Sequence, residues 1–336
     1  MVKSQEITEQ RVWEKFVLER SEANFLHSWG WGEFYRRLGN SVRRVGFYKS
    51  GKLVGVMQGV VEKARRATYM TVGGGPLLDW NDKTVVEYFR KKVAETAKEE
   101  KCSFVRVRPQ TIENEQNFRL FSKLGFVRAP MHLHAELTHQ LDLNKSEDEI
   151  LAGMRKTTRY EIKQAMKLGI EVKTGNDIGM FYDLQIATAK RQGFVPFGRK
   201  YLEEQFREFS NVGQCLLYTA YLRKEKLAQA MVIFYGQEAD YHYGASSEEG
   251  RKYPGAYLIQ WEAIKAAKRR GIKRYNFWGV APEGETKHRF YGVSVFKRGF
   301  GGQDMEYIHA RDLVIDWPRY AVNWVIEITR RITRGL

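Results

Sequence analysis

The sequence predicts a mixed α/β (α+β) protein made of two copies of one domain, because the same landmarks occur twice in its 336 residues. An apolar run begins at Lys52-Leu53 and again at Lys226-Leu227 (226 − 52 = 174). The strand after each run ends in a glycine, Gly73 and then Gly244, at almost the same offset (244 − 73 = 171). A repeat of this length indicates two whole domains and argues against a solenoid of short units.

The second half of the repeat is an amphipathic helix that leads into a strand. Lys98 and Lys268 hold equivalent places in the two helices (268 − 98 = 170). The sequences KLGF and FKRGF then place Gly125 and Gly299 at the offset with which the repeat began (299 − 125 = 174). Four landmarks in one order at nearly constant spacing predict a duplicated domain, and the cleft between two such copies is a natural place for a site.

Composition agrees with two compact domains, which we expect at residues 1–145 and 146–316. The chain is 43% apolar and 13% aromatic, which is enough for two cores, and no Pro/Gly/Ser-rich linker interrupts it. The formal charge of +16 favours a polyanionic partner such as RNA, a nucleotide-bearing substrate or an anionic membrane surface. The alternative is a protein that is merely basic.

The sequence predicts a cytoplasmic protein without a membrane span. Cys102 and Cys215 lie in apolar, strand-like contexts, so we interpret them as reduced core thiols. Residues 1–16 are charged and lack the apolar core of a signal peptide. The best apolar candidate for a span, 321–328, is broken by Glu327.

Three histidines fall on one expected strand of the first domain. The elements expected there are helices at 8–20 and 82–100 and strands at 42–48, 53–61, 67–72, 103–108 and 131–143. His132 and His134 would face the same side of the last strand, which also contains His139. Three ligands on one short strand cannot surround an ion without partners from elsewhere. We therefore interpret them as polar-face histidines and expect no metal site.

The second domain opens with a helix that carries a basic stripe. Arg155, Arg159, Lys163 and Lys167 recur every four residues, and like charges at this spacing repel by about 0.2–0.5 kcal/mol per pair. One interpretation is a solvated helix face. The other is that the stripe contacts phosphates, for example those of a tRNA.

The centre of the second domain resembles an acyl-CoA N-acyltransferase. We expect Tyr241 and Tyr243 on one face of a strand that ends before Gly244, and a helix follows the next loop. A strand, a glycine-bearing loop and a helix in this order can hold a phosphate at the helix N-terminus. Both loops, 73–76 and 251–256, depart from the glycine-dense pyrophosphate loop of such enzymes, which favours an acyl donor other than CoA. The elements expected in this domain are helices at 177–192, 200–209 and 256–271 and strands at 216–222, 227–236, 239–246 and 273–278.

A lysine stands between aromatic residues and glycines near the end of the repeat. Phe296-Lys297-Arg298-Gly299-Phe300 follows the strand at 273–278 and a glycine-bounded loop. Such a lysine is suited to contact a phosphate or a developing oxyanion. The alternative is a surface hairpin with a solvated lysine.

These segments together resemble the FemABX family of peptidyltransferases over nearly the whole chain. The motifs are WGWGEFYRRLG, MRKTTRYEIKQAMKLGIEV, HYGASS, AYLIQWEAIKAAKRRGIKRYNFWGV and GVSVFKRGFGG, of which the closing block at 255–302 is the most specific. The resemblance implies tandem GNAT-like domains, each a mixed central sheet flanked by helices. It also implies transfer of an amino acid from aminoacyl-tRNA to the side-chain amine of a peptidoglycan stem peptide, with lipid II or UDP-MurNAc-pentapeptide as acceptor.

The resemblance also implies site residues. The lysine of the F-K-x-G-F segment maps onto Lys297, with Phe296 beside it, and the tyrosine before the strand's glycine maps onto Tyr243. We assign Lys297 to stabilise anionic groups or the tetrahedral oxyanion and Tyr243 to orient the acceptor, with Tyr241 as a further substrate contact. No cofactor is expected.

Other substrate contacts carry over from the family with looser register. A basic residue after the aromatic segment would contact precursor phosphates, and Arg36 or Arg37 is the candidate, while an Arg/Tyr pair falls at Arg199 and Tyr201. The long helical arm of several members is missing, so the chain resembles the armless, FemX-like type. By analogy, a helix at 317–336 would pack on the first domain, and we expect a monomer.

Three other functions remain open from the sequence. One is a CoA-dependent N-acyltransferase on the same doubled fold, and another is a non-catalytic RNA-binding protein. The third is aminoacyl transfer to a lipid headgroup, which the basic, aromatic C-terminal helix favours because such a helix can lie on the inner face of an anionic membrane. For the main hypothesis we expect a sequential complex without an acyl-enzyme, since the ester of an aminoacyl-tRNA is already activated and needs mainly alignment.

Overall fold

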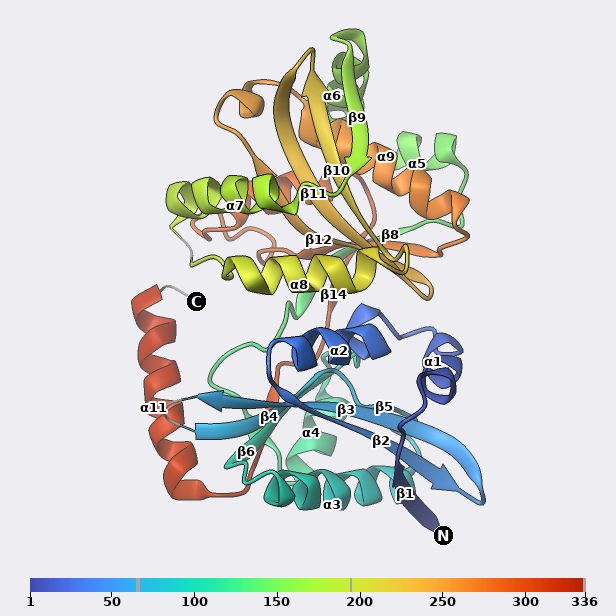
Figure 1. The fold of residues 1–336 in the computed structure, drawn as a ribbon, viewed down its shortest axis with the longest axis vertical. Coiled ribbons are helices and arrows are strands. Elements are labelled where there is room, and N and C mark those ends of the chain that lie inside the picture. The colour runs from blue at the N-terminus through green and yellow to red at the C-terminus, as the bar shows by residue number, and fades with distance from the viewer. Residues whose placement is uncertain (65–66, 194, 335–336) are drawn as a thin grey trace. The chain divides into compact units, whose positions relative to one another are not determined.

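The computed structural model describes residues 1–64, 67–193 and 195–334, and the chain divides into two units. Unit 1 comprises Met1–Glu136 and Glu306–Leu336, and unit 2 comprises Leu137–Met305. Each unit contains one mixed sheet with helices on its faces, so the predicted fold class is confirmed (Figure 1). No paired long helices resembling an arm occur in the described part of unit 2.

The two sheets have the same strand order. In unit 1 the order is β1-β2-β3-β4-β6-β15-β7, with β5 paired to β3, and in unit 2 it is β9-β10-β11-β12-β13-β8-β14. The strands of unit 1 are β1 (Val2–Glu6), β2 (Ser41–Lys49), β3 (Lys52–Ala64), β4 (Ala67–Gly74), β5 (Leu77–Leu78), β6 (Phe104–Pro109), β7 (Val127–Arg128) and β15 (Arg311–Val314). Those of unit 2 are β8 (Leu137–Asp142), β9 (Ile170–Gly175), β10 (Cys215–Leu222), β11 (Glu225–Tyr235), β12 (Glu238–Ser246), β13 (Arg274–Gly279) and β14 (Gln303–Glu306).

The sixth strand of each sheet is exchanged between the two repeats. β8 follows the first repeat in the chain but pairs antiparallel with β13 of the second sheet. β15 follows the second repeat but pairs antiparallel with β6 and β7 of the first sheet. The boundaries therefore fall at 136/137 and 305/306, which corrects our expected boundaries of 145/146 and 316/317. A sequence repeat does not reveal such an exchange, because the exchanged strands carry no landmark.

Unit 1 places helices on both faces of its sheet. α3 begins after Asp82, whose side chain accepts a hydrogen bond from the Val85 amide at 3.3 Å, and its apolar face packs with Phe47, Met70 and Val107 in one core. α2 packs on the other face, where Arg44 of β2 is buried beneath it and donates to the carbonyl oxygen of Trp29. The helices are α1 (Gln10–Leu18), η1 (Phe25–His27), α2 (Trp29–Arg37), α3 (Lys83–Glu99), α4 (Glu115–Lys123) and α11 (Trp317–Arg334).

A buried ion cluster fastens α11 to the first sheet. Arg106 of β6 donates two hydrogen bonds of 2.8 Å to Asp312 and one of 2.8 Å to Glu327 of α11. Tyr320 of α11 donates to the same Asp312 at 3.0 Å and packs edge-on against Phe104. The helix thus packs on unit 1. Residues 335–336 of the expected helix at 317–336 lie outside the described part of the chain.

Unit 2 is covered by α6 and α9 on one face of its sheet and by α7 and α8 on the other (Figure 1). Ala230 and Val232 of β11 point toward α9 and pack with Ile259 and Ile264 in the main core. The helices are α5 (Glu147–Gly153), α6 (Lys156–Lys167), α7 (Ile178–Gln192), α8 (Arg199–Ser210), η2 (Glu249–Lys252), α9 (Gly255–Arg269) and α10 (Tyr291–Arg298). Both cysteines, Cys102 in unit 1 and Cys215 in unit 2, are buried free thiols as expected.

The histidine strand expected at 131–143 is shorter in the structure. Regular pairing begins only at Leu137, so His132 and His134 lie in an irregular segment and the alternation argument does not apply to them. His139 lies on β8 and is buried, with one ring nitrogen 2.7 Å from Asp304 and the other 2.7 Å from the carbonyl oxygen of Gly301. It is an internal structural group and not a polar-face side chain.

Candidate active site

The parallel strands β12 and β13 part at the residues that the sequence singled out. They pair only over 238–240 and 274–276, although β12 continues to Ser246 and β13 to Gly279. A bulge at His242 shifts β12 against β11, and Trp278 of β13 has a φ of 65°, in the left-handed region. The ladder therefore ends after three residue pairs, and the side chains beyond it surround an open end of the sheet.

Lys297 lies at this open end, in the last turn of α10. The helix and the burial of this side chain contradict the alternative interpretation, a surface hairpin with a solvated lysine. The side chain is buried, and its Nζ donates to the carbonyl oxygen of Gly279 at 2.6 Å and lies 5.8 Å from the ring centroid of Tyr241. No carboxylate of the described residues forms an ion pair with this amine. Burial lowers the pKa of Lys297 to about 7, so the amine is present in both protonation states near neutrality.

Tyr241 and Phe296 line a cavity of about 210 Å³ beside the N-terminus of α9. Gly244 makes room for the tyrosine, since a Cβ at that position would overlap the Tyr241 hydroxyl oxygen. Arg191 of α7 and Arg251 of η2 bring positive charge to the same cavity. The other lining residues are Thr188, Gln229, Ala230, Gly244, Ala245, Ser246, Ala256, Ile259, Gln260 and Val293. A cavity with two guanidinium groups at a helix N-terminus is suited to hold a phosphate-bearing ligand.

Tyr243 does not share a face with Tyr241, contrary to expectation. Tyr241 pairs with Val232 and Tyr243 with Met231, which are consecutive residues of β11, so the two tyrosines point to opposite faces of the sheet. The bulge at His242 inserts one extra residue and so reverses the alternation. Simple period-two counting could not detect it.

Tyr243 gathers instead with aromatic residues near α8. Phe197 stacks on Tyr201 with ring centroids 4.3 Å apart and approaches the ring of Tyr243 at 6.1 Å. His242 connects this group to the open end of the sheet, since its ring lies 4.0 Å from that of Tyr243 and 5.4 Å from that of Trp278. His242 and Trp278 were not predicted as site residues, although the histidine between the two tyrosines was a visible signal.

Arg199 lies at the start of α8 and is exposed. Its Nε donates to Glu203 at 2.7 Å, and its guanidinium lies 5.9 Å from the ring centroid of Tyr182. It is thus on the same helix as Tyr201, as the proposed Arg/Tyr pair requires.

Two residues of the basic stripe make structural contacts in unit 2. Arg155 precedes α6 and donates to the carbonyl oxygen of Val295 in α10, and Arg159 donates to that of Ala152 at 3.1 Å. Cations near helix C-termini are favourable because the last carbonyl groups lack helical partners. These bonds offset the repulsion along the stripe, whereas Lys163 is exposed to solvent.

Arg36 and Arg37 belong to unit 1, at the end of α2. Arg36 donates to Glu33 at 3.1 Å and is half exposed. Arg37 is exposed on the surface of the same unit.

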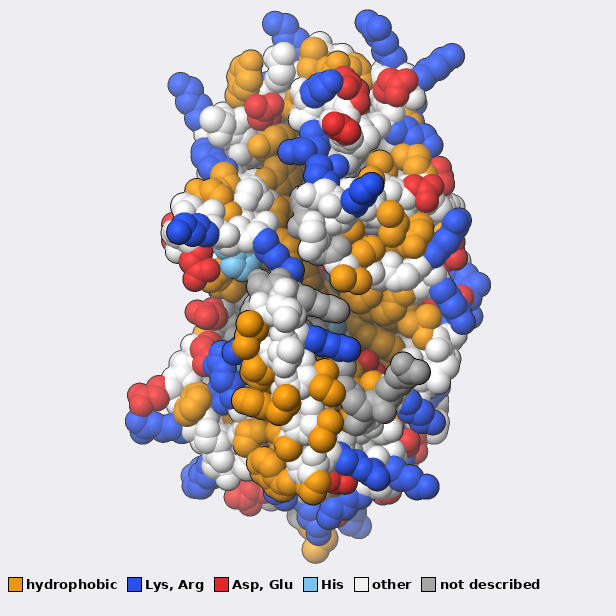
Figure 2. All heavy atoms as spheres, turned by 90° about the vertical axis from the view of Figure 1, so that its left-hand side faces the viewer, with side chains coloured by type: hydrophobic (Ala, Val, Ile, Leu, Met, Phe, Trp, Pro, Cys, Tyr) orange, Lys and Arg blue, Asp and Glu red, His pale blue; other side chains and the backbone are white. Residues whose placement is uncertain are grey.

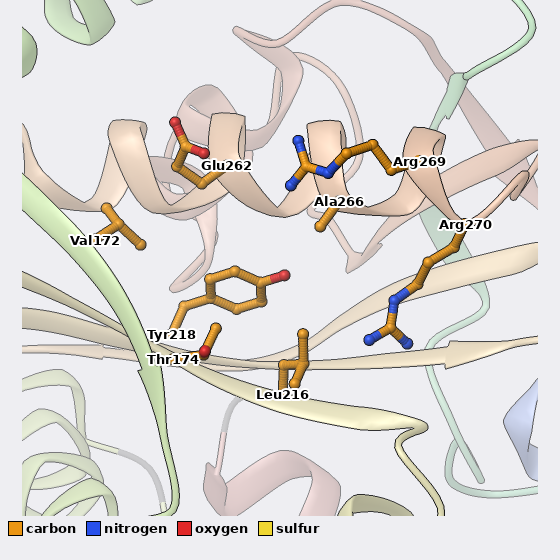
Figure 3. A pocket seen from close by; sticks show the side chains of 8 residues that line it. All are labelled: Val172, Thr174, Leu216, Tyr218, Glu262, Ala266, Arg269 and Arg270. Atoms are coloured by element: carbon orange, nitrogen blue, oxygen red, sulfur yellow. The ribbon is translucent and has the colours of Figure 1, made fainter.

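A second, larger cavity in unit 2 contains none of the predicted residues. It has a volume of about 390 Å³ and lies between α9 and the strands β9 and β10, at the other edge of the sheet from β13 (Figure 3). The hydroxyl of Tyr218 lies below α9 in this view, and among the described residues it has no hydrogen-bond partner. Because β11 and β12 separate it from the open end of the sheet, this cavity is not part of the candidate active site.

The model of the FemAB family matches residues 8–123, 125–226 and 217–327 of this chain. Similar curated proteins include lipid II:glycine glycyltransferases of Staphylococcus epidermidis, with 22% identity, and of Staphylococcus aureus, with 21% identity. In both cases the match covers 95% of this chain and 94% of the relative. The alignment with the first spans 394 positions against 336 residues here, so the relative has insertions that this chain lacks.

Solved structures agree on the fold. FemX superposes with a TM-score of 0.86 at 20% identity, covering 97% of this chain and 100% of that chain. A tandem GNAT protein from the clavulanic acid biosynthesis pathway superposes with a TM-score of 0.56 at 11% identity, covering 94% and 99%. Both units of this chain are therefore GNAT-like. No helix among the described residues is long and apolar enough to cross a membrane.

Proposed function

This chain belongs to the FemAB family and is a transferase of acyl or aminoacyl groups. On this basis we propose that it moves an amino acid from aminoacyl-tRNA to a peptidoglycan precursor. The acceptor is the side-chain amine of the stem peptide. The names of the relatives support lipid II as the acceptor and glycine as the first amino acid to test.

The buried Lys297 at the open end of the second sheet is the observation that carries this proposal. The cavity beside it, with Arg191 and Arg251 at the N-terminus of α9, is suited to the phosphates of a tRNA 3′ end. An ester carbonyl near Lys297 would develop negative charge during attack, and a cation without a carboxylate partner can stabilise that charge.

The reaction needs no covalent enzyme intermediate. The neutral stem amine attacks the ester carbonyl, the N–C bond forms, the C–O bond to the ribose breaks, and the amine proton leaves with the ribose oxygen. The protein's contribution is to align the two substrates and to hold charge at the oxyanion. In unit 2, Tyr243, Tyr201 and Arg199 orient the acceptor. Arg36 and Arg37 of unit 1 are kept as the proposed contacts of precursor phosphates.

The test compares two lysines at equivalent places in the two repeats. Lys297 and Lys123 have the same offset as the glycines that follow them (297 − 123 = 174), and Lys123 is exposed in the last turn of α4. We expect Lys297→Met to lower kcat/KM with glycyl-tRNA and lipid II by about 100-fold or more, and Lys123→Met to leave it unchanged. Equal rates in both folded variants would remove Lys297 from the mechanism.

The same assay separates the alternatives. Turnover with acetyl-CoA instead of charged tRNA would favour an N-acyltransferase, for which the tandem GNAT fold is the supporting observation. Turnover with phosphatidylglycerol instead of lipid II would favour headgroup transfer. Binding of tRNA with no turnover on any amine would favour an RNA-binding protein.

Contact with the inner face of the membrane is supported by the outer face of α11. Figure 2 shows hydrophobic side chains gathered on this side of the molecule, over α11. The exposed large apolar residues of the helix are Trp317, Val322, Trp324, Val325 and Ile332. The exposed Arg319 and Arg330 complement an anionic lipid surface.

Vesicle binding tests this contact. We expect Trp324→Ser with Val325→Ser to weaken co-sedimentation with phosphatidylglycerol vesicles several-fold, because both side chains are exposed and apolar. Val212→Ser removes an equally exposed apolar residue of unit 2 and should have no effect. Unchanged binding in the double variant would show that α11 is not the contact.

A further inference from the structure

Three side chains meet in unit 1 at the place where the chain leaves this unit and re-enters it. Nδ1 of His132 lies 2.6 Å from Oε2 of Glu136, and Nδ1 of His309 lies 2.8 Å from the same oxygen. The two imidazole rings are 5.2 Å apart at an angle of 71°. One ligand atom from each residue falls within 4.8 Å of the others, so two imidazoles and a carboxylate converge on one point.

Both ring nitrogens of His309 face oxygen atoms, so a proton or a metal ion must lie between one nitrogen and its oxygen. Its Nε2 lies 2.9 Å from the carbonyl oxygen of Ala129 and must carry a proton, because a carbonyl can only accept. Nδ1 of the neutral ring then directs a lone pair at the carboxylate of Glu136, which also only accepts. Two acceptors at 2.8 Å require either a proton between them, carried by the ring or by the carboxyl group, or a metal ion.

The surroundings hold the three groups in place. Oε1 of Glu136 accepts from the amide of Ala310 at 2.9 Å, and the amide of His309 donates to Glu113 at 2.9 Å. A ligating histidine whose other nitrogen donates to a backbone carbonyl is the usual outer-shell arrangement of metal sites.

We propose that His132, Glu136 and His309 form a binding site for Zn²⁺, with water as the fourth ligand. Two histidines and one glutamate are a recurrent zinc ligand set, and tetrahedral Zn–N and Zn–O bonds place ligand atoms about 3.3 Å apart. The present contacts of 2.6 and 2.8 Å must open by about 0.7 and about 0.5 Å. The exposed His132 can make this adjustment because its side chain is 57% accessible.

A metal ion here would join two segments that are far apart in the sequence. Residues 129–136 and 306–311 are separated along the chain by the whole of unit 2, Leu137–Met305. A cross-link that closes a long loop removes more disorder from the unfolded chain than one that closes a short loop. The ion therefore serves the stability of unit 1, and the inference is independent of the proposed transfer reaction.

The test uses tag-free, full-length protein treated with EDTA and then titrated with Zn²⁺ alone. Isothermal titration calorimetry should report one Zn²⁺ ion per chain, and thermal unfolding should show a higher Tm with Zn²⁺ than without it. Co²⁺ in place of Zn²⁺ should give the visible absorption of a tetrahedral complex. His132→Ala, which alters an exposed residue, should weaken Zn²⁺ binding at least tenfold. His288→Ala is the matched control, because His288 lies in unit 2 and should leave binding unchanged.

Glu136→Gln gives a second reading, since the amide keeps the shape but is a poor zinc ligand. Loss of the Co²⁺ spectrum in both cluster variants supports the site. The inference is overturned if the wild-type protein shows no Co²⁺ spectrum, or if His132→Ala binds Zn²⁺ as tightly as the wild type. In either case the three side chains form a hydrogen-bonded cluster without a metal ion.

Discussion

The two units share a strand order, but one sheet is closed where the other is open. In unit 1, β4 pairs with β6 over six positions, 69–74 with 104–109, and the amide of Gln110 continues to Gly74. In unit 2, the equivalent strands β12 and β13 pair over three positions and then part. The lysines at equivalent places after these strands also differ in burial, since Lys123 of unit 1 is exposed and Lys297 of unit 2 is buried. In unit 1 the two parallel strands stay paired to their ends, whereas in unit 2 they separate, and the candidate site lies at this separation.

The largest expected effect concerns the closed unit. Arg106→Met leaves the buried carboxylates of Asp312 and Glu327 without their cation, and breaking a buried ion cluster in this way costs about 3–5 kcal/mol. We expect the free energy of unfolding, measured by urea denaturation, to fall by that amount. Lys91→Met removes an exposed pair with Glu95 and should change it by less than about 1 kcal/mol. Similar losses in the two variants would mean that the cluster does not hold unit 1.

A smaller effect separates the two equivalent glycines near the ends of β4 and β12, Gly73 and Gly244. A Cβ at Gly244 would overlap the Tyr241 hydroxyl, whereas one at Gly73 would meet the end of the His134 side chain at 2.5 Å. We expect Gly244→Ala to cost about 1–3 kcal/mol through overcrowding and to lower the transfer rate by moving Tyr241 away from Lys297. Gly73→Ala should cost less, because the histidine can swing aside. The reverse order in denaturation midpoints would contradict the packing at the open end.

The smallest effect is a pH dependence confined to the open unit. Burial lowers the pKa of Lys297 from 10.5 to about 7, so between these values the unfolded chain binds a proton that the folded chain does not. Stability then rises with pH, by at most about 1.4 kcal/mol per pH unit, and below about pH 7 this contribution stops changing. We expect the wild type to gain about 1 kcal/mol of stability over Lys297→Met from pH 7 to pH 8. The free energy of unfolding of Lys123→Met should change with pH in the same way as that of the wild type. An equally large pH-dependent difference for Lys123→Met would point to a cause other than burial.

Much of the fold could be predicted from the sequence, because its signals are local. The helix at 83–99 and the strands 52–64 and 225–235 lie within a few residues of their expected positions, since apolar periodicity and glycine endings mark them directly. The exchange of β8 and β15 could not be predicted, because their partners lie far along the chain: β8 pairs with 274–279, and β15 pairs with 104–107.

The candidate site was predictable in its residues but only partly in its geometry. Lys297, Phe296 and Tyr241 come together around the open end of the sheet, as a family motif would suggest. The bulge that turns Tyr243 to the other face has no sequence signal of its own. The cluster of His132 with Glu136 was missed because its third member, His309, follows only after the whole of unit 2.

Because the sixth strands are exchanged, unit 2 is a continuous stretch of the chain and unit 1 is not. Unit 2 is one continuous stretch, 137–305, which already contains the strands of its sheet. Unit 1 is assembled from both ends of the polypeptide. A fragment ending at residue 136 would lack β15, so one edge of β6 and the strand β7 would lose their pairing partner. A circularly permuted chain that runs from residue 306 to the C-terminus and on into residue 1 would therefore keep all strands of the first sheet in one continuous piece.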